Sequence, residues 1–272
     1  MRSRPRAAHV ERPPLMPSFP RIADLAPLIE TAGWQWTPFT TPSFPRKTLW
    51  RGKDRGGNCW LTKLRGDFYA YREIVFARLA QKMNWSCQSS VFIRIDKESA
   101  HVLEVGPGSV HAANWFLEEH AGIACGADCN FAPLVGRVIG RVEDLVNVPV
   151  AHVLDWPKSE MAACLFGGNE PPGHLITQAH EFVIIDSEQM FSTAPSPFDC
   201  TRWWGDPASP HPSGVRIGQQ VCADFLALSL SAIDAALEPP SGIQINERWP
   251  IAPLLRESVV FAQTRALSTS GG

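Results

Sequence analysis

Residues Cys59–Met83 read CWLTKLRGDFYAYREIVFARLAQKM, and this stretch decides the predicted fold. Its first six residues form a short, mainly apolar run, which predicts a strand containing Lys63. From Phe68 onward, apolar residues recur every three or four positions, which predicts a helix with Asp67 as its N-cap. The stretch therefore predicts a strand with a lysine, followed by a helix with a glutamate at Glu73.

The neighbouring residues extend this pattern into a small mixed unit. TLWRG at 48–52 predicts a strand, and KDRGGN at 53–58 predicts a glycine turn that contains Gly56 and Gly57. The strand with Lys63 then completes a hairpin, and SSVFIRID at 89–96 predicts one more strand after the helix. The predicted order is strand, glycine turn, strand with lysine, helix with glutamate, and strand.

Composition and charge exclude some classes of protein. Of the 272 residues, 44% are hydrophobic and 19% are charged, and the formal net charge of −2 gives no overall attraction to nucleic acid or anionic lipid. Seven scattered cysteines favour a reducing compartment over a disulfide framework, so a cytoplasmic protein is expected. Residues 1–20 are rich in proline and arginine and lack a continuous apolar segment, which predicts a disordered or extended arm and no membrane anchor.

A second informative stretch is FVIIDSEQMF at 182–191, an apolar run that stops at Asp186. Its β-branched residues predict a short buried strand, and a carboxylate at the end of such a strand needs a partner. PPGHLI at 171–176 predicts the other strand of a hairpin, and residues 155–170 predict a helix that breaks at GGN. The order is helix, loop, small hairpin and terminal aspartate.

This order is the one in which kinase-like folds present the groups that handle a nucleotide. The charge of a triphosphate must be met by fixed cations, and a buried anion is needed to hold a long lysine in place. Lys63 fits the lysine, Glu73 fits its helix partner, and Asp186 fits a ligand of a divalent metal bound to the phosphates. Alone, Lys63 and Glu73 would each be interpreted as solvent-facing residues, so the hypothesis rests on their order.

The two stretches resemble a known family. KLRGDFYAYREIVFARLAQKM resembles the lysine strand and helix of the small HipA-like kinases, and FVIIDSEQMF resembles their metal-aspartate segment, which is shared more loosely with the phosphatidylinositol 3/4-kinase-like group. The likeness covers residues 50–191 as ordered landmarks, and it describes a divergent member. It implies an ATP-dependent phosphotransferase fold with Lys63 and the Gly56–Gly57 turn on the phosphates, Glu73 paired with Lys63, and Asp186 on Mg²⁺.

One segment departs from the family pattern. The loop before the hairpin reads GGNEPPGHLI and contains no aspartate, although the family has one there, followed by an asparagine that binds a second metal. Glu170 could replace the aspartate chemically, but Pro171 and Pro172 restrict its reach. Asn169 is a nearby polar group, and His174 falls where the metal-binding asparagine would be, although Mg²⁺ prefers oxygen ligands.

The remaining elements complete the predicted architecture. The spacing over residues 22–33 predicts a leading helix, and residues 221–237 and 250–267 predict two more helices. The chain is therefore expected to have an α+β, two-lobed protein kinase-like fold. A small β-rich N-lobe spans residues 21–97, and a mainly helical C-lobe spans residues 98–272.

Three hypotheses about function remain open at this point. The protein could be an ATP- and Mg²⁺-dependent transferase of phosphoryl or nucleotidyl groups, with Glu170 and Asp186 as catalytic residues and Asp186, His174 and Asn169 as metal ligands. It could instead be a pseudokinase, a nucleotide-binding regulatory or interaction module, or the likeness could be accidental. The expected partners are a nucleotide and a protein substrate or binding protein, with no membrane and no nucleic acid.

Overall fold

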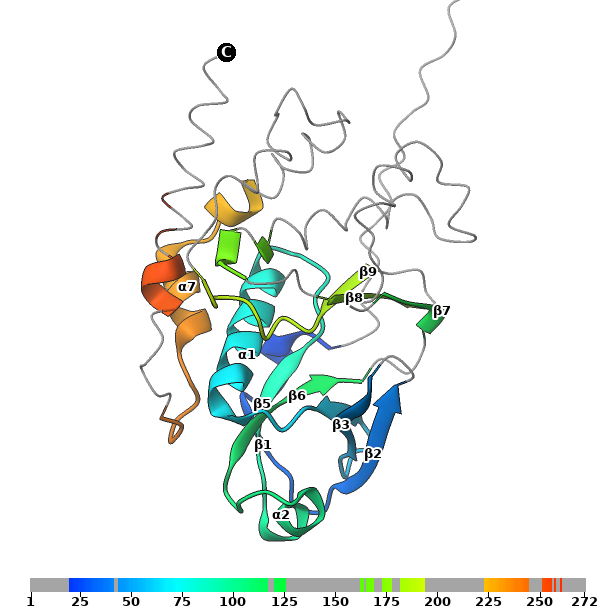
Figure 1. Ribbon diagram of the computed structural model, residues 1–272. Helices are drawn as coiled ribbons and strands as arrows, with labels where there is room; N and C mark the ends of the chain where they lie inside the picture. Colours follow the sequence, from blue (N-terminus) through cyan, green and yellow to red (C-terminus); the bar gives the residue numbers. More distant parts are fainter. Residues whose placement is uncertain are drawn as a thin grey trace, which may run out of the picture.

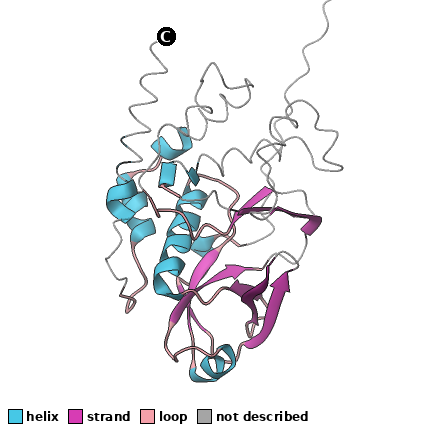
Figure 2. Ribbon diagram, in the orientation of Figure 1, coloured by secondary structure: helices cyan, strands magenta, loops and turns pink. Residues whose placement is uncertain are grey.

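The computed structural model shows a six-stranded sheet, a smaller three-stranded sheet, and helices packed beside them (Figure 1, Figure 2). No helix in the part of the chain that it describes is long and apolar enough to cross a membrane. The description covers residues 20–41, 44–116, 120–125, 162–163, 165–168, 173–177, 182–193, 223–244, 251–255, 257 and 260, with only the backbone at 40–48, 67, 120–125, 173–177 and 182.

The larger sheet has the strand order β1-β5-β6-β4-β3-β2. β1 pairs with β5 in parallel, and all other neighbours are antiparallel. The hairpin predicted around the KDRGGN turn and the strand predicted at 89–96 are both confirmed. The strands are β1 (Leu28–Glu30), β2 (Gln35–Thr41), β3 (Phe44–Lys53), β4 (Cys59–Thr62), β5 (Ser90–Arg94) and β6 (Val110–Trp115). The sheet thus continues to Trp115, past the residue 97 at which the N-lobe was expected to end.

The leading helix predicted over residues 22–33 is wrong. Only a 3₁₀ turn, η1 (Ile22–Asp24), forms there, and the chain then becomes the edge strand β1. Pro27 explains the difference, because proline has no amide hydrogen to donate and disfavours helical backbone at the residue before it. Leu28 instead pairs with Phe92 of β5.

Helix α1 (Gly66–Lys82) is the predicted central helix, and it packs between the large sheet and α7 (Leu230–Leu237). Its N-cap residue is Arg65, so the prediction of Asp67 as the N-cap is wrong. One side of α1 buries Ala70 and Ile74 against Phe92 of β5, whereas another side faces the main core. That core contains residues from both halves of the chain, including Phe76, Leu79, Leu165, Phe166, Phe191, Phe225, Ile233 and Leu255.

Tryptophans form a second core on the other side of the sheet. Trp34 lies 5.3 Å from Trp36 and 6.0 Å from Trp60 between ring centroids. Gly52 of β3 is required there, because a Cβ at this position would lie 2.7 Å from atoms of both the Trp34 and the Trp36 ring. Helix α2 (Lys97–Leu103) contributes Leu103 to the same cluster.

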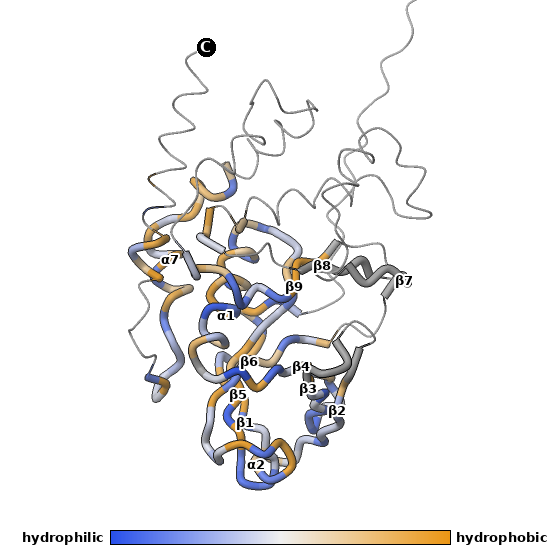
Figure 3. Tube along the Cα trace, in the orientation of Figure 1, coloured by the Kyte–Doolittle hydropathy of each residue, from blue (hydrophilic) through white to orange (hydrophobic). Residues whose placement is uncertain are grey.

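The smaller sheet has the order β7-β8-β9, with β7 (His120–Cys125), β8 (Gly173–Thr177) and β9 (Phe182–Ile185). Antiparallel pairing of β8 with β9 confirms the hairpin predicted before Asp186. β9 is apolar and buried, with Val183 and Ile184 at 0% and 1% exposure (Figure 3). The Ile184 amide donates to Ser86 O at 2.8 Å, and the Gln88 amide donates to Ile184 O at 2.8 Å. These bonds fix β9 to the chain that leaves α1.

The C-terminal helices differ from the prediction where they are described. The helix expected over residues 221–237 is interrupted: residues 223–226 are helical, and α7 starts anew after Ser229. The Ser229 side chain caps α7 by accepting a hydrogen bond from the Ala232 amide at 3.1 Å. Within the helix predicted at 250–267, residues 251–255 are helical, and most of the helix predicted at 155–170 lies outside the described residues.

Candidate functional site

Lys63 follows β4 directly, and its ammonium group contacts three carboxylates from distant parts of the chain. Its Nζ lies 3.2 Å from Glu188 Oε2 and 3.9 Å from Glu73 Oε1, and it donates a hydrogen bond to Asp186 Oδ1. The Lys63 side chain is 16% exposed. The structure therefore brings together the three residues that sequence order singled out, Lys63, Glu73 and Asp186, and adds Glu188.

Burial and charge together set the protonation of this cluster. Burial alone would lower the pKa of Lys63, but Glu73, Asp186 and Glu188 outweigh it and hold the pKa above its ordinary value. Lys63 is therefore a fixed cation at neutral pH. Burial raises the pKa of Glu73 to about 7, although Lys63 and a hydrogen bond from Asn114 act in the opposite direction. This bond runs from Asn114 Nδ2 of β6 to Glu73 Oε1 at 3.1 Å.

Asp186 lies immediately after β9 with its backbone in the left-handed region, at a φ of 55°. Aspartate tolerates this conformation better than most residues do, and such outliers are concentrated at functional sites. Its side chain is 49% exposed, in contrast to the buried Glu73 and Glu188. The Asp186 carboxylate is therefore open to a ligand on one side and bound to Lys63 on the other.

The residues after Asp186 dock against α1. Ser187 Oγ donates to the Glu73 backbone carbonyl at 3.5 Å, and Arg72 Nε donates to Met190 O at 2.5 Å. The Phe191 amide donates to Phe166 O at 2.9 Å. These contacts place the helix that holds Glu73 and the segment that holds Asp186 in one fixed arrangement.

Glu188 and Arg65 are parts of the cluster that sequence reasoning missed. Glu188 is 5% exposed, and its two carboxylate oxygens contact different cations, Lys63 on one side and Arg65 Nη1 on the other. Neither residue has a sequence signal of its own, because each is a charged residue beside a turn and its partner lies far away in the chain.

Comparison with solved structures finds chains of similar fold. The crystal structure of the Helicobacter pylori proinflammatory kinase CtkA aligns with 90% of this chain and 100% of its own, with a TM-score of 0.59 and 10% sequence identity. The fold is kinase-like. This confirms the predicted two-lobed α+β architecture, and at this identity the likeness concerns the fold alone. No protein-family model and no curated protein sequence matches the chain.

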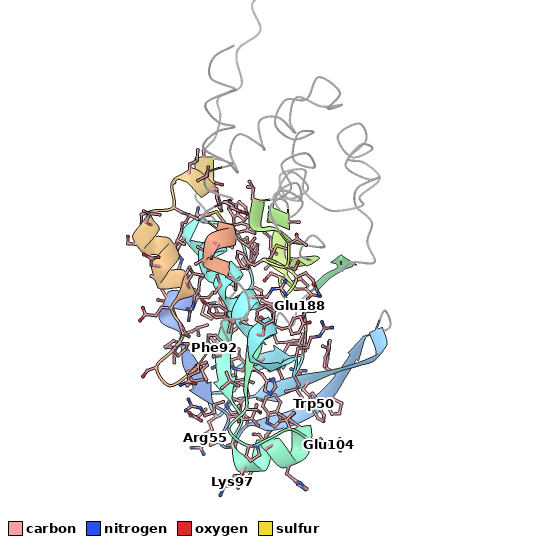
Figure 4. The ribbon with its side chains drawn as sticks, turned by 60° about the vertical axis from the view of Figure 1, so that its left-hand side comes forward. Trp50, Arg55, Phe92, Lys97, Glu104 and Glu188 are labelled. Carbon is pink, nitrogen blue, oxygen red and sulfur yellow. The ribbon has the colours of Figure 1, made fainter. Side chains whose placement is uncertain are left out.

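Within this kinase-like fold, Gly56 and Gly57 lie away from Lys63. Lys53 pairs with Cys59 and Trp50 with Thr62, so the glycine turn and Lys63 are at opposite ends of β4. At about 3.3 Å per residue, Cys59, the first residue of β4, is already about 13 Å from Lys63. Figure 4 shows Arg55, next to these glycines, far from Glu188.

The hydrogen bonds of the glycine turn join residues of the hairpin to one another. Asp54 Oδ1 accepts from the Asn58 amide at 2.9 Å, and Asp54 Oδ2 accepts from Trp60 Nε1 at 3.0 Å. The Gly57 amide donates to Asp54 O at 3.0 Å, and Gly57 has a φ of +86° that favours glycine. These amides are used within the hairpin, so the turn is closed on itself.

Strands β2 and β3 extend past the Lys63 end of β4. Because Trp50 is opposite Thr62, the part of β3 before Trp50 runs past Lys63. β2 pairs with β3 there as far as Thr41, which lies opposite Phe44. The described ends of β2 and β3 are therefore on the side of β4 away from Gly56 and Gly57.

The remaining predicted site residues precede β9 in the sequence. Asn169 and Glu170 lie outside the described residues. The His174 backbone is in β8, opposite Ile184, and nothing is described of its side chain. In the described part of the chain, no three His, Cys, Asp or Glu residues are grouped so that they could hold a metal ion.

Proposed function

We propose that this protein is an ATP-dependent transferase of kinase-like fold that moves a phosphoryl or nucleotidyl group. The observation that supports this best is the contact of Lys63 with Glu73 and Asp186 in one cluster. Lys63 and Asp186 are separated by 123 positions in the sequence, and the fold that joins them resembles that of a kinase. A fixed lysine supported by a buried glutamate, beside an exposed aspartate, suits the binding of a metal–nucleotide complex.

Each residue has a role that its environment supports. Lys63 would bind the phosphates, and buried Glu73 would keep the lysine in place when a nucleotide competes for it. Asp186 would hold Mg²⁺, because Mg²⁺ prefers oxygen ligands and this carboxylate is the half-exposed one of the cluster. When bound, the metal would neutralise charge that develops on the phosphates.

The transfer itself needs an acceptor and a base. In phosphoryl transfer, the acceptor oxygen bonds to the γ-phosphorus, the bond to the β–γ bridging oxygen breaks, and ADP leaves. In nucleotidyl transfer, the acceptor bonds to the α-phosphorus and pyrophosphate leaves. In either reaction we assign the acceptor's proton to Glu170, with Asn169 and His174 as further metal or orienting groups and a protein as one candidate acceptor.

A second candidate function is supported by one specific observation. GGNEPPGHLI has no aspartate where kinase-like folds hold the residue that orients the acceptor. Lys63, Glu73 and Asp186 would then bind a nucleotide without transfer, and the protein would act as a pseudokinase through its contacts with other proteins.

Labelled ATP distinguishes these alternatives. The purified protein is incubated with Mg²⁺ and ATP that is labelled in either the γ- or the α-phosphate, with and without added protein acceptors. Transfer of the γ-label alone would identify a kinase, and transfer of the α-label would identify a nucleotidyl transferase. Transfer of neither label by a protein that still binds ATP would leave the pseudokinase, and Lys63→Ala and Asp186→Asn serve as inactive controls.

A further inference from the structure

We propose that Arg65 is a second phosphate-binding side chain of this site, placed beside Lys63 by Glu188. The inference rests on the proposed nucleotide-binding function and adds a residue to it. Its chemistry is recognition of a polyphosphate by two adjacent cations, one an ammonium group and the other a guanidinium group.

The shared carboxylate places the two cations close to each other. Glu188 Oε2 is 3.2 Å from Lys63 Nζ, and Glu188 Oε1 accepts a hydrogen bond from Arg65 Nη1. Because both oxygens belong to one buried carboxylate, Arg65 and Lys63 approach it from its two sides. A polyphosphate bound to Lys63 is therefore long enough to contact Arg65 as well.

Arg65 also has donors to spare. Among the described residues, Nη1 of Arg65 has its partner in Glu188, and no bond is made by Nε or Nη2. The Arg65 side chain is 32% exposed, compared with 7% for that of Glu188. A guanidinium group binds phosphate oxygens through several N–H groups at once, so the free donors of Arg65 can contact a phosphate while Nη1 stays on Glu188.

The backbone around Arg65 favours an anion at the same place. Leu64 and Gly66 both have positive φ, 49° and 78°, so the chain turns sharply between β4 and α1 at Arg65. α1 is 17 residues long, and its N-cap residue Arg65 makes no side-chain capping bond. The Gly66 amide donates to His111 Nδ1 at 3.3 Å, and the positive end of the helix dipole lies at this terminus.

A second arginine, on α1, adds positive charge near Glu188. Arg72 lies seven residues after Arg65, which is two helical turns. It is 4% exposed, and its charge interacts with that of Glu188. Arg72 Nη2 has no hydrogen-bond partner among the described residues. The buried guanidinium of Arg72 thus offsets part of the negative charge of Glu188.

The test compares Arg65→Lys and Arg65→Ala with the parent protein by calorimetric titration. The probes are Mg²⁺–ATP, inorganic tripolyphosphate and adenosine. Arg65→Lys keeps a cation that can pair with Glu188 but removes the additional N–H donors of the guanidinium group. This variant should therefore keep the fold of the parent protein. The matched control is Arg94→Lys, because Arg94 is 34% exposed and its Nη1 pairs with Glu30 at 2.8 Å, as part of a similar surface ion pair elsewhere.

We expect both Arg65 variants to bind tripolyphosphate and Mg²⁺–ATP about tenfold or more weakly, the loss expected for charged hydrogen bonds. Adenosine affinity and all affinities of Arg94→Lys should stay at parental values. If the parent binds and a folded Arg65→Lys variant binds tripolyphosphate equally well, the inference is overturned while the proposed function stands. If the parent binds none of the phosphate probes, the proposed function itself fails.

Discussion

Glu73 shows most clearly how burial shapes this site. It is a carboxylate at 4% exposure that shares one lysine with two other carboxylates. The loss of hydration raises the pKa of Glu73 to about 7, so near neutral pH it can hold a proton or an ion pair with Lys63. Its protonation is therefore coupled to the charge that the cluster presents to a ligand.

Glu73→Gln should remove a pH dependence of stability. The folded protein keeps the Glu73 proton up to about pH 7, whereas the unfolded chain loses it near pH 4.5, so this residue makes stability fall as pH rises between these values. Compared with the parent, Glu73→Gln should therefore gain on the order of 2 kcal/mol in relative stability from pH 5 to pH 8. Urea unfolding at both pH values measures it, and a difference that does not change with pH would contradict the assignment.

Three residues of the site could be predicted from the sequence patterns that surround them. Lys63 follows a strand, Glu73 lies on a strongly periodic helix, and Asp186 ends an apolar run. Arg65 and Glu188 could not be weighed in the same way, since a charged residue beside a turn is ordinary until its partner is known. Gly57 favours a wrong interpretation, because a glycine is needed there for the positive φ of the hairpin turn.

Helix α2 is a short element whose start depends on one side chain. Asp96 Oδ1 accepts from the amides of Glu98 and Ser99 at 2.8 and 3.3 Å. Its Oδ2 accepts from Thr31 Oγ1 at 2.7 Å and from Ser99 Oγ at 2.6 Å. Hydrogen bonds from Ser99 and Thr31 lower the pKa of Asp96 to about 2, although burial opposes them. Asp96 thus joins α2 to the chain after β1.

Asp96→Ala should lower the free energy of unfolding by about 1–2 kcal/mol, the usual cost of an N-cap. Nucleotide affinity should not change, because α2 is at the far end of the sheet from Glu188 (Figure 4). Glu98→Ala in the same first turn is the control and should cost less than about 0.5 kcal/mol. Equal losses in the two variants, measured by urea unfolding, would show that Asp96 is not the cap.

At the level of elements, strong periodicity predicts the structure correctly, whereas the effects of proline and of helix breaks do not show in the periodicity. α1 and the two hairpins follow directly from their sequence patterns. The helical spacing of Leu25, Leu28 and Ile29 predicts a helix where β1 forms, because pairing with β5 decides the conformation of this segment. Tertiary contacts of this kind override local preference and are not visible in a single segment.

The whole molecule is joined by contacts between its two halves at α1 and β9. Backbone bonds link Ile184 to Ser86 and Gln88, and a shared core links Phe76 with Phe166. Sequence order suggested that Lys63 and Asp186 face each other, but only this docking brings them into contact. Because this docking joins Lys63 and Asp186 in one site, replacing either residue should weaken the binding of the ligand.

The central claim is that Lys63 and Asp186 form one nucleotide–metal site. Calorimetric titration of Mg²⁺–ATP into the parent and into folded Lys63→Ala and Asp186→Asn variants tests it most directly, with Arg94→Ala as a control at a remote ion pair. The account predicts saturable binding by the parent and the control, and at least about tenfold weaker binding by both site variants. Binding of the two variants as tight as that of the parent would contradict it.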